Sequence, residues 1–162
     1  IVEIDAATFE GGGDTIWHPG LARIWLGHGF RSTPDAAAAL AAVFDAEVVP
    51  LRLRDERFYH LDTCLCPVDE GTAIVFPGAF APEELETIAR RFPRLVEADG
   101  GEARRGMACN AAAFLGRHVV LSSGCPKTER TLRDLGYLVT AVDTSEFLRS
   151  GGGVYCMKQG VF

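Results

Sequence analysis

Four side chains that could carry chemistry recur along this 162-residue sequence at nearly equal intervals. Glu10, His60, Asn110 and Cys156 are separated by 50, 50 and 46 residues, and each lies near the start of a similar segment. A carboxylate, a histidine and a cysteine are the components of an activated thiol site. The carboxylate orients the imidazole, the imidazole exchanges protons with the leaving group and with water, and the thiolate attacks carbon. The spacing therefore favours Glu10, His60 and Cys156 as catalytic residues.

Each of these three residues also has an ordinary structural interpretation. A single cysteine is most often a small buried hydrophobic residue. His60 in "FYHLD" could be a half-buried histidine with satisfied hydrogen bonds, and Glu10 in "FEGGGD" could belong to a glycine-shaped turn. The shared spacing favours the functional interpretation of the set.

The neighbouring charges indicate what such a site would bind. Asp62 follows His60 by two residues, so in a strand the two side chains would share a face. Two acidic groups beside a histidine and a thiol suit a cationic headgroup. Arg31, just after "GHGF", offers a planar guanidinium for a carboxylate, unless it is simply a surface residue. A substrate with a cation at one end and a carboxylate at the other would satisfy both.

The elements that must position these residues form a repeat of 45 to 50 residues. Each unit opens with an apolar segment, followed by a second apolar segment, a helical pattern with proline near its start, and a short extended run. The second segments are 24–30, 74–80 and 119–125, the helices 34–45, 81–92 and 126–136, and the extended runs 47–53, 94–98 and 137–142. The opening segments are 8–18, 58–68, 105–115 and 151–159. The pattern predicts an α/β fold of strand–strand–helix–strand units. Units arranged around an axis would bring the four equivalent side chains together.

Composition excludes several classes of protein. The net charge is −6, the pI is near 5.2 and basic residues form only short pairs, so a nucleic-acid surface is not expected. No apolar run approaches the roughly 18 residues that indicate a membrane span. The string "EGGGD" lacks the glycine spacing of a dinucleotide-binding loop.

The five cysteines are odd in number and scattered, which indicates a reduced, cytoplasmic protein. Cys64 and Cys66 form a CxC pair rather than a zinc knuckle, so we expect them to pack beside the site and expect no metal. Cys125 precedes Pro126 at a predicted helix start, where the dipole could lower the pKa of its thiol, but it has no partner base.

At "FEGGGD", "FYHLDTCLCP", "CNAAAFL" and "GGGVYCM" the sequence resembles the guanidino-group-modifying superfamily, which includes dimethylarginine dimethylaminohydrolase, arginine deiminase and glycine amidinotransferase. The order, spacing and type of these strings match across essentially the whole chain, and "FYHLDTC" is the most telling. The resemblance implies a pseudo-fivefold α/β propeller of ββαβ units, the pentein fold. This chain would supply the C-terminal three-fifths: about three units plus a closing strand.

The resemblance also assigns roles. The family's acidic residue, histidine and terminal cysteine fall on Glu10, His60 and Cys156. Asp62 would contact the guanidinium, and Arg31, in the looser match "HGFRST", would bind the substrate carboxylate.

Two further residues complete the expected substrate-binding set. They are Asp14, at the end of "FEGGGD", and Gly152, in a glycine run that would let the backbone approach a flat substrate.

The implied chemistry is hydrolysis of the guanidino C–N bond of arginine or a substituted arginine through a cysteine thiouronium adduct, which gives a ureido product such as citrulline. No metal or organic cofactor is required. Two alternatives stay open: an amidinotransferase that passes the amidino group to an amine, and a propeller that serves only as a binding module.

Length is the departure from the family pattern. A fivefold propeller needs five units, and the chain begins with Ile1 rather than methionine, so we expect 1–162 to be one portion of a single catalytic domain. The resemblance implies that an N-terminal segment carries another substrate-binding acidic residue and the loop that covers the substrate. Expected partners are a small cationic guanidino substrate, this segment in cis or as a second chain, and a homodimer as a further option. Neither nucleic acid nor a membrane is expected.

Overall fold

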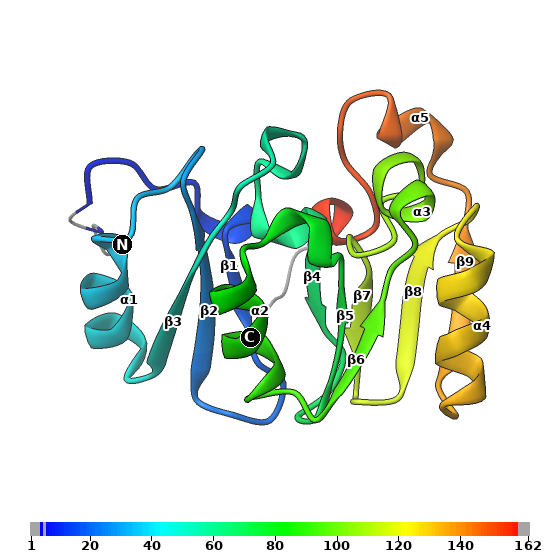
Figure 1. The fold of residues 1–162 in the computed structure, drawn as a ribbon, viewed down its shortest axis with the longest axis horizontal. Helices are drawn as coiled ribbons and strands as arrows, with labels where there is room; N and C mark the ends of the chain where they lie inside the picture. The colour runs from blue at the N-terminus through cyan, green and yellow to red at the C-terminus, as the bar shows by residue number, and fades with distance from the viewer. Residues whose placement is uncertain (1–3, 5, 159–162) are drawn as a thin grey trace.

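Three units of the same kind stand side by side in chain order (Figure 1). The structure is a computed structural model that describes residue 4 and residues 6–158. Each unit is a three-stranded sheet in which the first two strands are antiparallel and the last two are parallel, joined by a helix. Unit 1 contains β1 (Thr15–Trp17), β2 (Arg23–His28), α1 (Ala36–Phe44) and β3 (Glu47–Arg52). Unit 2 contains β4 (Leu65–Pro67), β5 (Thr72–Val75), α2 (Pro82–Ala89) and β6 (Arg94–Glu97). Unit 3 contains β7 (Ala112–Phe114), β8 (His118–Ser122), α4 (Pro126–Asp134) and β9 (Leu138–Val142).

The predicted ββαβ repeat is therefore confirmed three times. Each middle strand lies between two partners and packs under a helix, which explains its nearly continuous apolar sequence. β5 is buried along its whole length. Pro82 and Pro126 occupy the first helical positions of α2 and α4, where a missing N–H costs no hydrogen bond. The units match the α/β propeller expected from the resemblance.

The segments that open the units differ from the prediction. Before each of the first two inner strands the chain makes one 3-10 turn: η1 (Gly11–Gly13) and η3 (Leu61–Thr63). The predicted closing strand 151–159 is wrong over 151–158, where the chain forms the turn η5 (Tyr155–Met157) instead; residue 159 lies outside the described residues. A three-residue turn is too short to leave a periodic pattern, so its sequence resembles the start of the strand that follows.

Three further short helices lie between the units or after the last of them. η2 (Glu56–Phe58) and α5 (Ser145–Leu148) lie at the upper edge in Figure 1, and α3 (Gly100–Arg105) links unit 2 to unit 3. Two glycines make a poor helix start, but the Asp99 carboxylate accepts the N–H groups of Gly101 and Glu102. Capping by one side chain therefore starts a helix that propensity alone does not predict.

A buried histidine joins unit 1 to unit 2. His18 stacks on Phe92 with ring centroids 4.4 Å apart, and its Nε2 lies 2.9 Å from the carbonyl oxygen of Glu70. The Trp25 indole N–H donates to Nδ1 at 3.3 Å. Nε2 therefore carries the proton and Nδ1 accepts, which requires the neutral ring. Burial lowers the pKa of His18 below its ordinary value of 6.5.

This histidine should make stability fall in acid. Because its pKa is lower in the folded than in the unfolded chain, the unfolded state binds more protons, and the free energy of unfolding drops as the pH falls below about 6.5. His18→Gln should cost about 1–2 kcal/mol at pH 7 and show a shallower loss between pH 7 and pH 5. Urea unfolding at several pH values measures both. The control His118→Gln changes an exposed ring that bonds Thr140 and should leave the wild-type slope intact, and equal slopes for all three proteins would refute the assignment.

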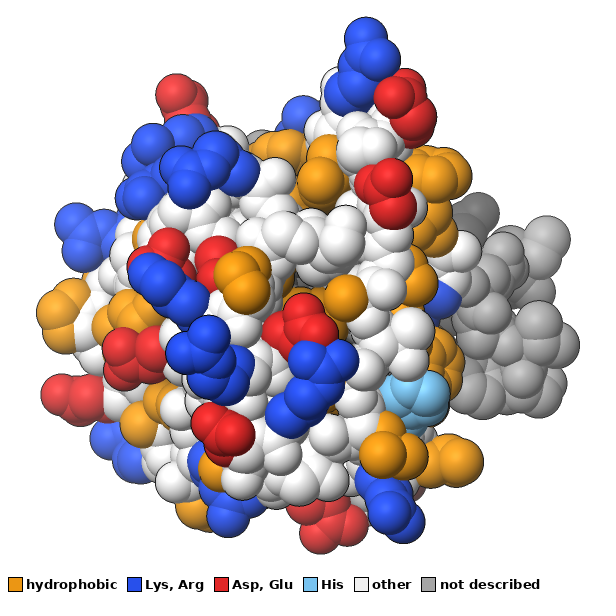
Figure 2. Space-filling view, turned by 90° about the vertical axis from the view of Figure 1, so that its right-hand side faces the viewer, with side chains coloured by type: hydrophobic (Ala, Val, Ile, Leu, Met, Phe, Trp, Pro, Cys, Tyr) orange, Lys and Arg blue, Asp and Glu red, His pale blue; other side chains and the backbone are white. Residues whose placement is uncertain are grey.

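The large hydrophobic side chains that remain exposed divide unevenly among the units. Residues 58–98, all of them described, form unit 2 with its opening turn and contain none. The exposed ones in unit 1 are Trp17, Leu21, Phe30, Val43 and Phe44, and those in unit 3 and the segment that follows it are Phe114, Leu115, Leu135, Leu138, Phe147 and Met157. Figure 2 shows the unit 3 end, with hydrophobic side chains interspersed among charged ones. The two end units therefore expose apolar surface. In the middle unit the corresponding surface is covered by the units on either side. No helix in the described part of the chain is long and apolar enough to cross a membrane.

Candidate active site

The turns that open the units converge on one pocket of about 320 Å³. Its lining comes from η1, from η3 with the residue before it, and from the C-terminal segment; the residues are Gly12, Gly13, His60, Asp62, Tyr155, Cys156 and Lys158. Segments up to 146 residues apart in sequence thus meet at one place, from Gly12 to Lys158. Three of the predicted site residues, His60, Asp62 and Cys156, line this pocket directly.

His60 and Glu10 form a hydrogen-bonded pair beside the pocket. Each directly precedes its 3-10 turn, and His60 Nε2 lies 2.7 Å from Glu10 Oε2. The hydrogen bond from His60 lowers the pKa of Glu10, and the charge of Arg31 adds to this. A carboxylate at Nε2 holds that proton in place and leaves Nδ1 as the ring nitrogen that can exchange one. A Cβ at position 13 would lie 2.6 Å from Nδ1, so Gly13 is required for the ring to lie here.

Asp62 lies in the η3 turn and not in a strand beside His60. The predicted shared strand face is therefore wrong, although both side chains reach the pocket. Burial raises the pKa of Asp62 to about 6, and its Oδ2 lies 3.4 Å from Cys156 Sγ. The other oxygen, Oδ1, is buried without a hydrogen-bond partner among the described residues. A buried carboxylate oxygen with no partner is a position for an N–H donor from outside the chain.

Cys156 differs from the other cysteines in its surroundings. All five lie in the described part of the chain; four are buried and Cys156 is exposed. Burial of its sulfur and then the neighbouring Asp62 charge raise the pKa of the Cys156 thiol. The side chain of Asn110 donates from Nδ2 to Sγ at 3.3 Å. The sequence spacing singled out Asn110, but no sequence signal indicates that its amide faces the thiol.

The glycine run before Cys156 is required mainly by packing. Gly151 has φ +81° and lies against Tyr59, whose hydroxyl donates to its carbonyl at 3.2 Å. A Cβ at 153 would lie 2.7 Å from Asn110 Oδ1. A Cβ at 152 would make only ordinary contact with Cys156, at 3.4 Å from its Cβ. Gly152 therefore adjoins the thiol, and its predicted contact with substrate stays a prediction.

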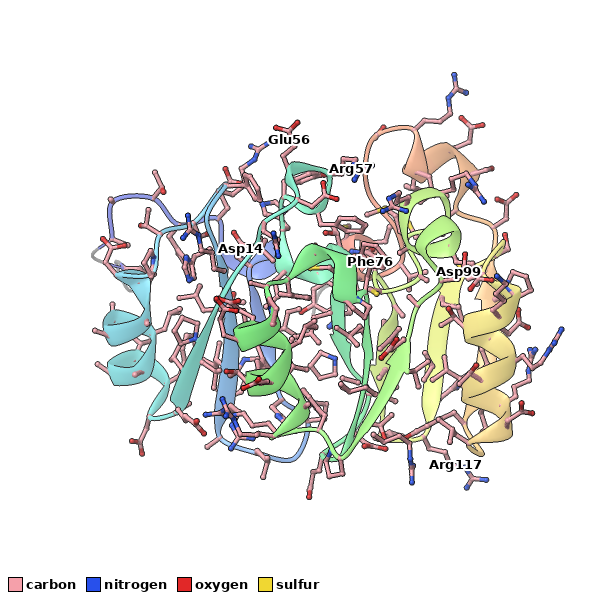
Figure 3. The ribbon with its side chains drawn as sticks, viewed as in Figure 1. Asp14, Glu56, Arg57, Phe76, Asp99 and Arg117 are labelled. Carbon is pink, nitrogen blue, oxygen red and sulfur yellow. The ribbon has the colours of Figure 1, made fainter. Side chains whose placement is uncertain are left out.

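Arg31 and Asp14 lie outside the pocket lining. Arg31 is half-exposed, 3.5 Å from Glu10 Oε1 and stacked over the Tyr59 ring at 5.2 Å. Asp14 is fully buried at the upper end of the first sheet (Figure 3), where its Oδ1 accepts the Leu61 N–H at 3.1 Å. Burial raises the pKa of Asp14. In this geometry Asp14 supports the η3 turn, and its predicted direct contact with substrate stays a prediction.

Tyr59 was missed by the sequence reasoning although it directly precedes His60. Its ring centroid lies 4.8 Å from that of His60, and the same ring carries Arg31 on its face. An aromatic residue beside a predicted catalytic histidine was the available signal. Tyr59 thereby links the arginine, the histidine and the glycine run that carries Cys156.

The remaining cysteines are structural. Cys64 and Cys66 are buried in the core, which confirms the packing prediction. The hypothesis that the helix start lowers the pKa of Cys125 is wrong: burial raises it to about 12. The Glu102 carboxylate already accepts the N–H groups of Lys127 and Thr128 there, at 2.7 and 3.0 Å. A negative charge at the helix start removes the benefit to a thiolate. Within the described residues, no three His, Cys, Asp or Glu side chains are grouped to hold a metal ion.

Comparison with known proteins gives close relatives, although no family model matches the chain. It is 36% identical over 154 residues to the bifunctional arginine dihydrolase/ornithine cyclodeaminase AgrE of Nostoc. The aligned region covers 92% of this chain and 21% of AgrE. The chain is 37% identical over 134 residues to the N(G),N(G)-dimethylarginine dimethylaminohydrolase of Mycobacterium tuberculosis, covering 83% of this chain and 44% of that protein. The chain thus spans a fifth to a half of the length of these relatives.

Solved structures agree with the sequence matches. The N-terminal domain of ArgZ, an arginine dihydrolase from cyanobacteria, superposes with a TM-score of 0.85 at 35% identity, over 91% of this chain and 54% of that domain. Dimethylarginine dimethylaminohydrolase from Pseudomonas aeruginosa superposes with a TM-score of 0.72 at 25% identity, over 90% of this chain and 53% of that one. Both lie within the superfamily that the sequence strings indicate. On sequence and fold together, the chain belongs to the guanidino-group-modifying superfamily.

Proposed function

We propose that this chain carries the catalytic residues of a hydrolase that cleaves the guanidino C–N bond of arginine or a substituted arginine. The observation that carries the proposal is the meeting of Cys156 Sγ with Asp62, 3.4 Å away, in the pocket lined by a histidine that is paired with Glu10. A thiol, a buried carboxylate and an oriented imidazole are what attack on a cationic carbon requires. The relatives' names, arginine dihydrolase and dimethylarginine dimethylaminohydrolase, support the same chemistry.

Substrate binding follows from the charges of the pocket. A guanidinium is planar, cationic and rich in N–H donors, which matches the partnerless Oδ1 of Asp62. Bringing a cation to Asp62 favours its ionised form and offsets the repulsion between Asp62 and a Cys156 thiolate. Arg31, half-exposed beside Glu10, is the group we assign to the substrate carboxylate. In this arrangement Asp62 binds the cationic end of the substrate and Arg31 binds its carboxylate end.

The reaction then proceeds in two steps. The Cys156 thiolate forms an S–C bond to the guanidinium carbon, and the C–N bond breaks as His60 gives its proton to the departing amine. His60 next takes a proton from water, whose oxygen attacks the thiouronium carbon; the S–C bond breaks, and the ureido product leaves with the thiolate restored. Structures of relatives include ArgZ covalently bound to a reaction intermediate and the Pseudomonas enzyme complexed with citrulline.

The rest of the domain is part of the proposal. The apolar surface of units 1 and 3 needs a partner, and the chain covers 54% of the ArgZ domain. We assign to these faces a complementary segment that completes the ring, preceding this chain or supplied by a second one. A homodimer that joins the two kinds of end face is the other arrangement to be distinguished.

The direct test is product formation. The chain, alone and with its complementary segment, is incubated with arginine and with dimethylarginine, and citrulline and ornithine are quantified, since the dihydrolase relatives are named for two hydrolyses. An amine acceptor in a parallel sample reports transfer to amines. Citrulline or ornithine formation supports hydrolysis, and an amidino-acceptor product alone would replace it by transfer. A monodisperse 17.5 kDa monomer with no tendency to associate would contradict the complementary segment.

The activity should rise with pH as Asp62 ionises. Because burial raises the pKa of Asp62 to about 6, the free enzyme holds a neutral acid below that pH and loses its attraction for a guanidinium. We expect kcat/KM to increase through pH 6. Asp62→Asn should lower kcat/KM about 100-fold and remove this acidic limb, while the limb from Cys156 ionisation remains. A variant that keeps the full wild-type profile would show that another group titrates.

A further inference from the structure

Asn110 occupies the third of the four equivalent positions, between the histidine and the cysteine. Its side chain is fully buried, and its backbone N–H closes a turn onto the carbonyl of Met107 at 2.8 Å. Met107 has φ +49°, an uncommon value for a residue with a side chain. The chain therefore accepts local strain at the turn that places this amide beneath the pocket.

The amide is oriented by main-chain groups on two other units of the structure. Its Oδ1 accepts the Tyr155 N–H at 3.0 Å, and its Nδ2 donates to the Asp62 carbonyl at 3.2 Å. An N–H can only donate and a C=O can only accept, so these two contacts decide which end of the amide is nitrogen. The second Nδ2 proton then faces Cys156 Sγ at 3.3 Å. The donor toward the sulfur is fixed before any substrate arrives.

The charges around the sulfur explain why such a donor matters. Asp62 faces Sγ from η3, His60 lines the same pocket with its Nε2 2.7 Å from Glu10, and Lys158 follows on the same segment as Cys156. Asp62, the charge in contact with the sulfur, is negative and opposes a thiolate. The protonated thiol can donate to Asp62 Oδ2 or, at 3.5 Å, to Asn110 Oδ1. Only the ionised sulfur draws the full benefit of the Nδ2 donor.

The glycine before the turn gives an independent sign of the same fit. A Cβ at 153 would lie 2.7 Å from Asn110 Oδ1 and 3.3 Å from its Cγ, both inside normal contact. The backbone therefore has no side chain at the one place where the amide must approach. Gly153 therefore leaves the space that the buried Asn110 side chain occupies.

We propose that Asn110 is a catalytic residue of this site: its Nδ2 donates a hydrogen bond to the Cys156 thiolate, and its Oδ1 holds the turn that aims the sulfur. The inference rests on the proposed function for its catalytic consequence, while the thiol–amide contact can be tested without any substrate. Asn110 thus stabilises the Cys156 thiolate, which the negative charge of Asp62 destabilises.

The test measures ionisation of Cys156 in the intact chain. Iodoacetamide alkylation is followed against pH, and mass spectrometry locates the label, since the other four cysteines are buried. In Asn110→Leu and Asn110→Asp we expect the thiol pKa to rise by about one unit and alkylation at pH 7 to slow about tenfold. The control Thr144→Val removes a different buried hydrogen bond of the third unit, to Ser122 at 2.8 Å, and should alkylate like the wild type.

A second measurement covers the case in which the variants do not fold. In the wild-type chain, the ¹⁵N signal of the Asn110 side chain should shift with the same apparent pKa as the alkylation rate. Folded variants with a wild-type alkylation profile, or an amide signal that ignores the titration, would overturn the proposal. A confirmed titration together with no hydrolysis of any guanidine would instead overturn only the proposed function.

Discussion

Cys156→Ser should abolish guanidine hydrolysis, reducing product formation by at least about 10³-fold. A hydroxyl at this position is far less ionised than a thiol and is therefore a much weaker nucleophile. The substitution should leave substrate binding close to normal because Asp62 and Arg31 are untouched. Citrulline formation by stopped assay and substrate binding by calorimetry measure the two effects separately.

The matched control for this variant is another cysteine. Cys125→Ala removes a buried thiol that lies outside the pocket and should lower stability but keep the rate per folded molecule. A haloamidine should label Cys156 in the wild type and spare the four buried cysteines. Retained hydrolysis in Cys156→Ser would contradict the thiouronium mechanism, and labelling spread over several cysteines would contradict the activated site.

His60→Asn should reduce kcat by about 10²- to 10⁴-fold, the usual contribution of a general acid and base. Glu10→Gln should cost less, about 10- to 100-fold, since Glu10 reaches the chemistry through the 2.7 Å contact with Nε2 of His60. The double variant should be no slower than His60→Asn alone, because the carboxylate has nothing left to orient. Steady-state rates of the four proteins complete the cycle.

The outcome of this cycle distinguishes two roles for Glu10. Multiplicative losses would mean that the carboxylate contacts the substrate itself, which its half-exposed position beside Arg31 permits geometrically. The Michaelis constant gives a second readout, because loss of a direct contact between Glu10 and the substrate should change KM. His118→Gln, on the outer face of unit 3, serves as the neutral control.

Periodicity was enough to predict the units and the convergence of their equivalent side chains. The apolar segments, prolines and spacing gave the three sheets and their crossover helices, because these elements are long enough to show a pattern. The turns were not predictable in this way. Four residues, 61–64, separate His60 from β4, and residues 60 and 62 line the pocket from the η3 turn and the residue before it rather than from a strand.

The roles of single residues depended on contacts distant in sequence. Asn110 bonds a sulfur 46 residues away, and Asp14 supports a turn 47 residues away. The sequence analysis singled out both residues, but it indicated neither of these contacts. Likewise α3 forms because of the Asp99 cap, and burial together with the nearby Glu102 charge raises the pKa of the Cys125 thiol. Such effects belong to tertiary structure, and no local propensity reports them.

The placement of one functional side chain per unit has a consequence for symmetry. A ring of identical subunits would put the same group at every equivalent position, so four carboxylates or four thiols would face one another and repel or merely duplicate. An acid, an imidazole, an amide and a thiol can surround a common centre only if the repeats are free to differ in sequence, as repeats within one chain are. Joining unequal repeats in one chain therefore allows a pseudo-symmetric fold to hold an asymmetric active site.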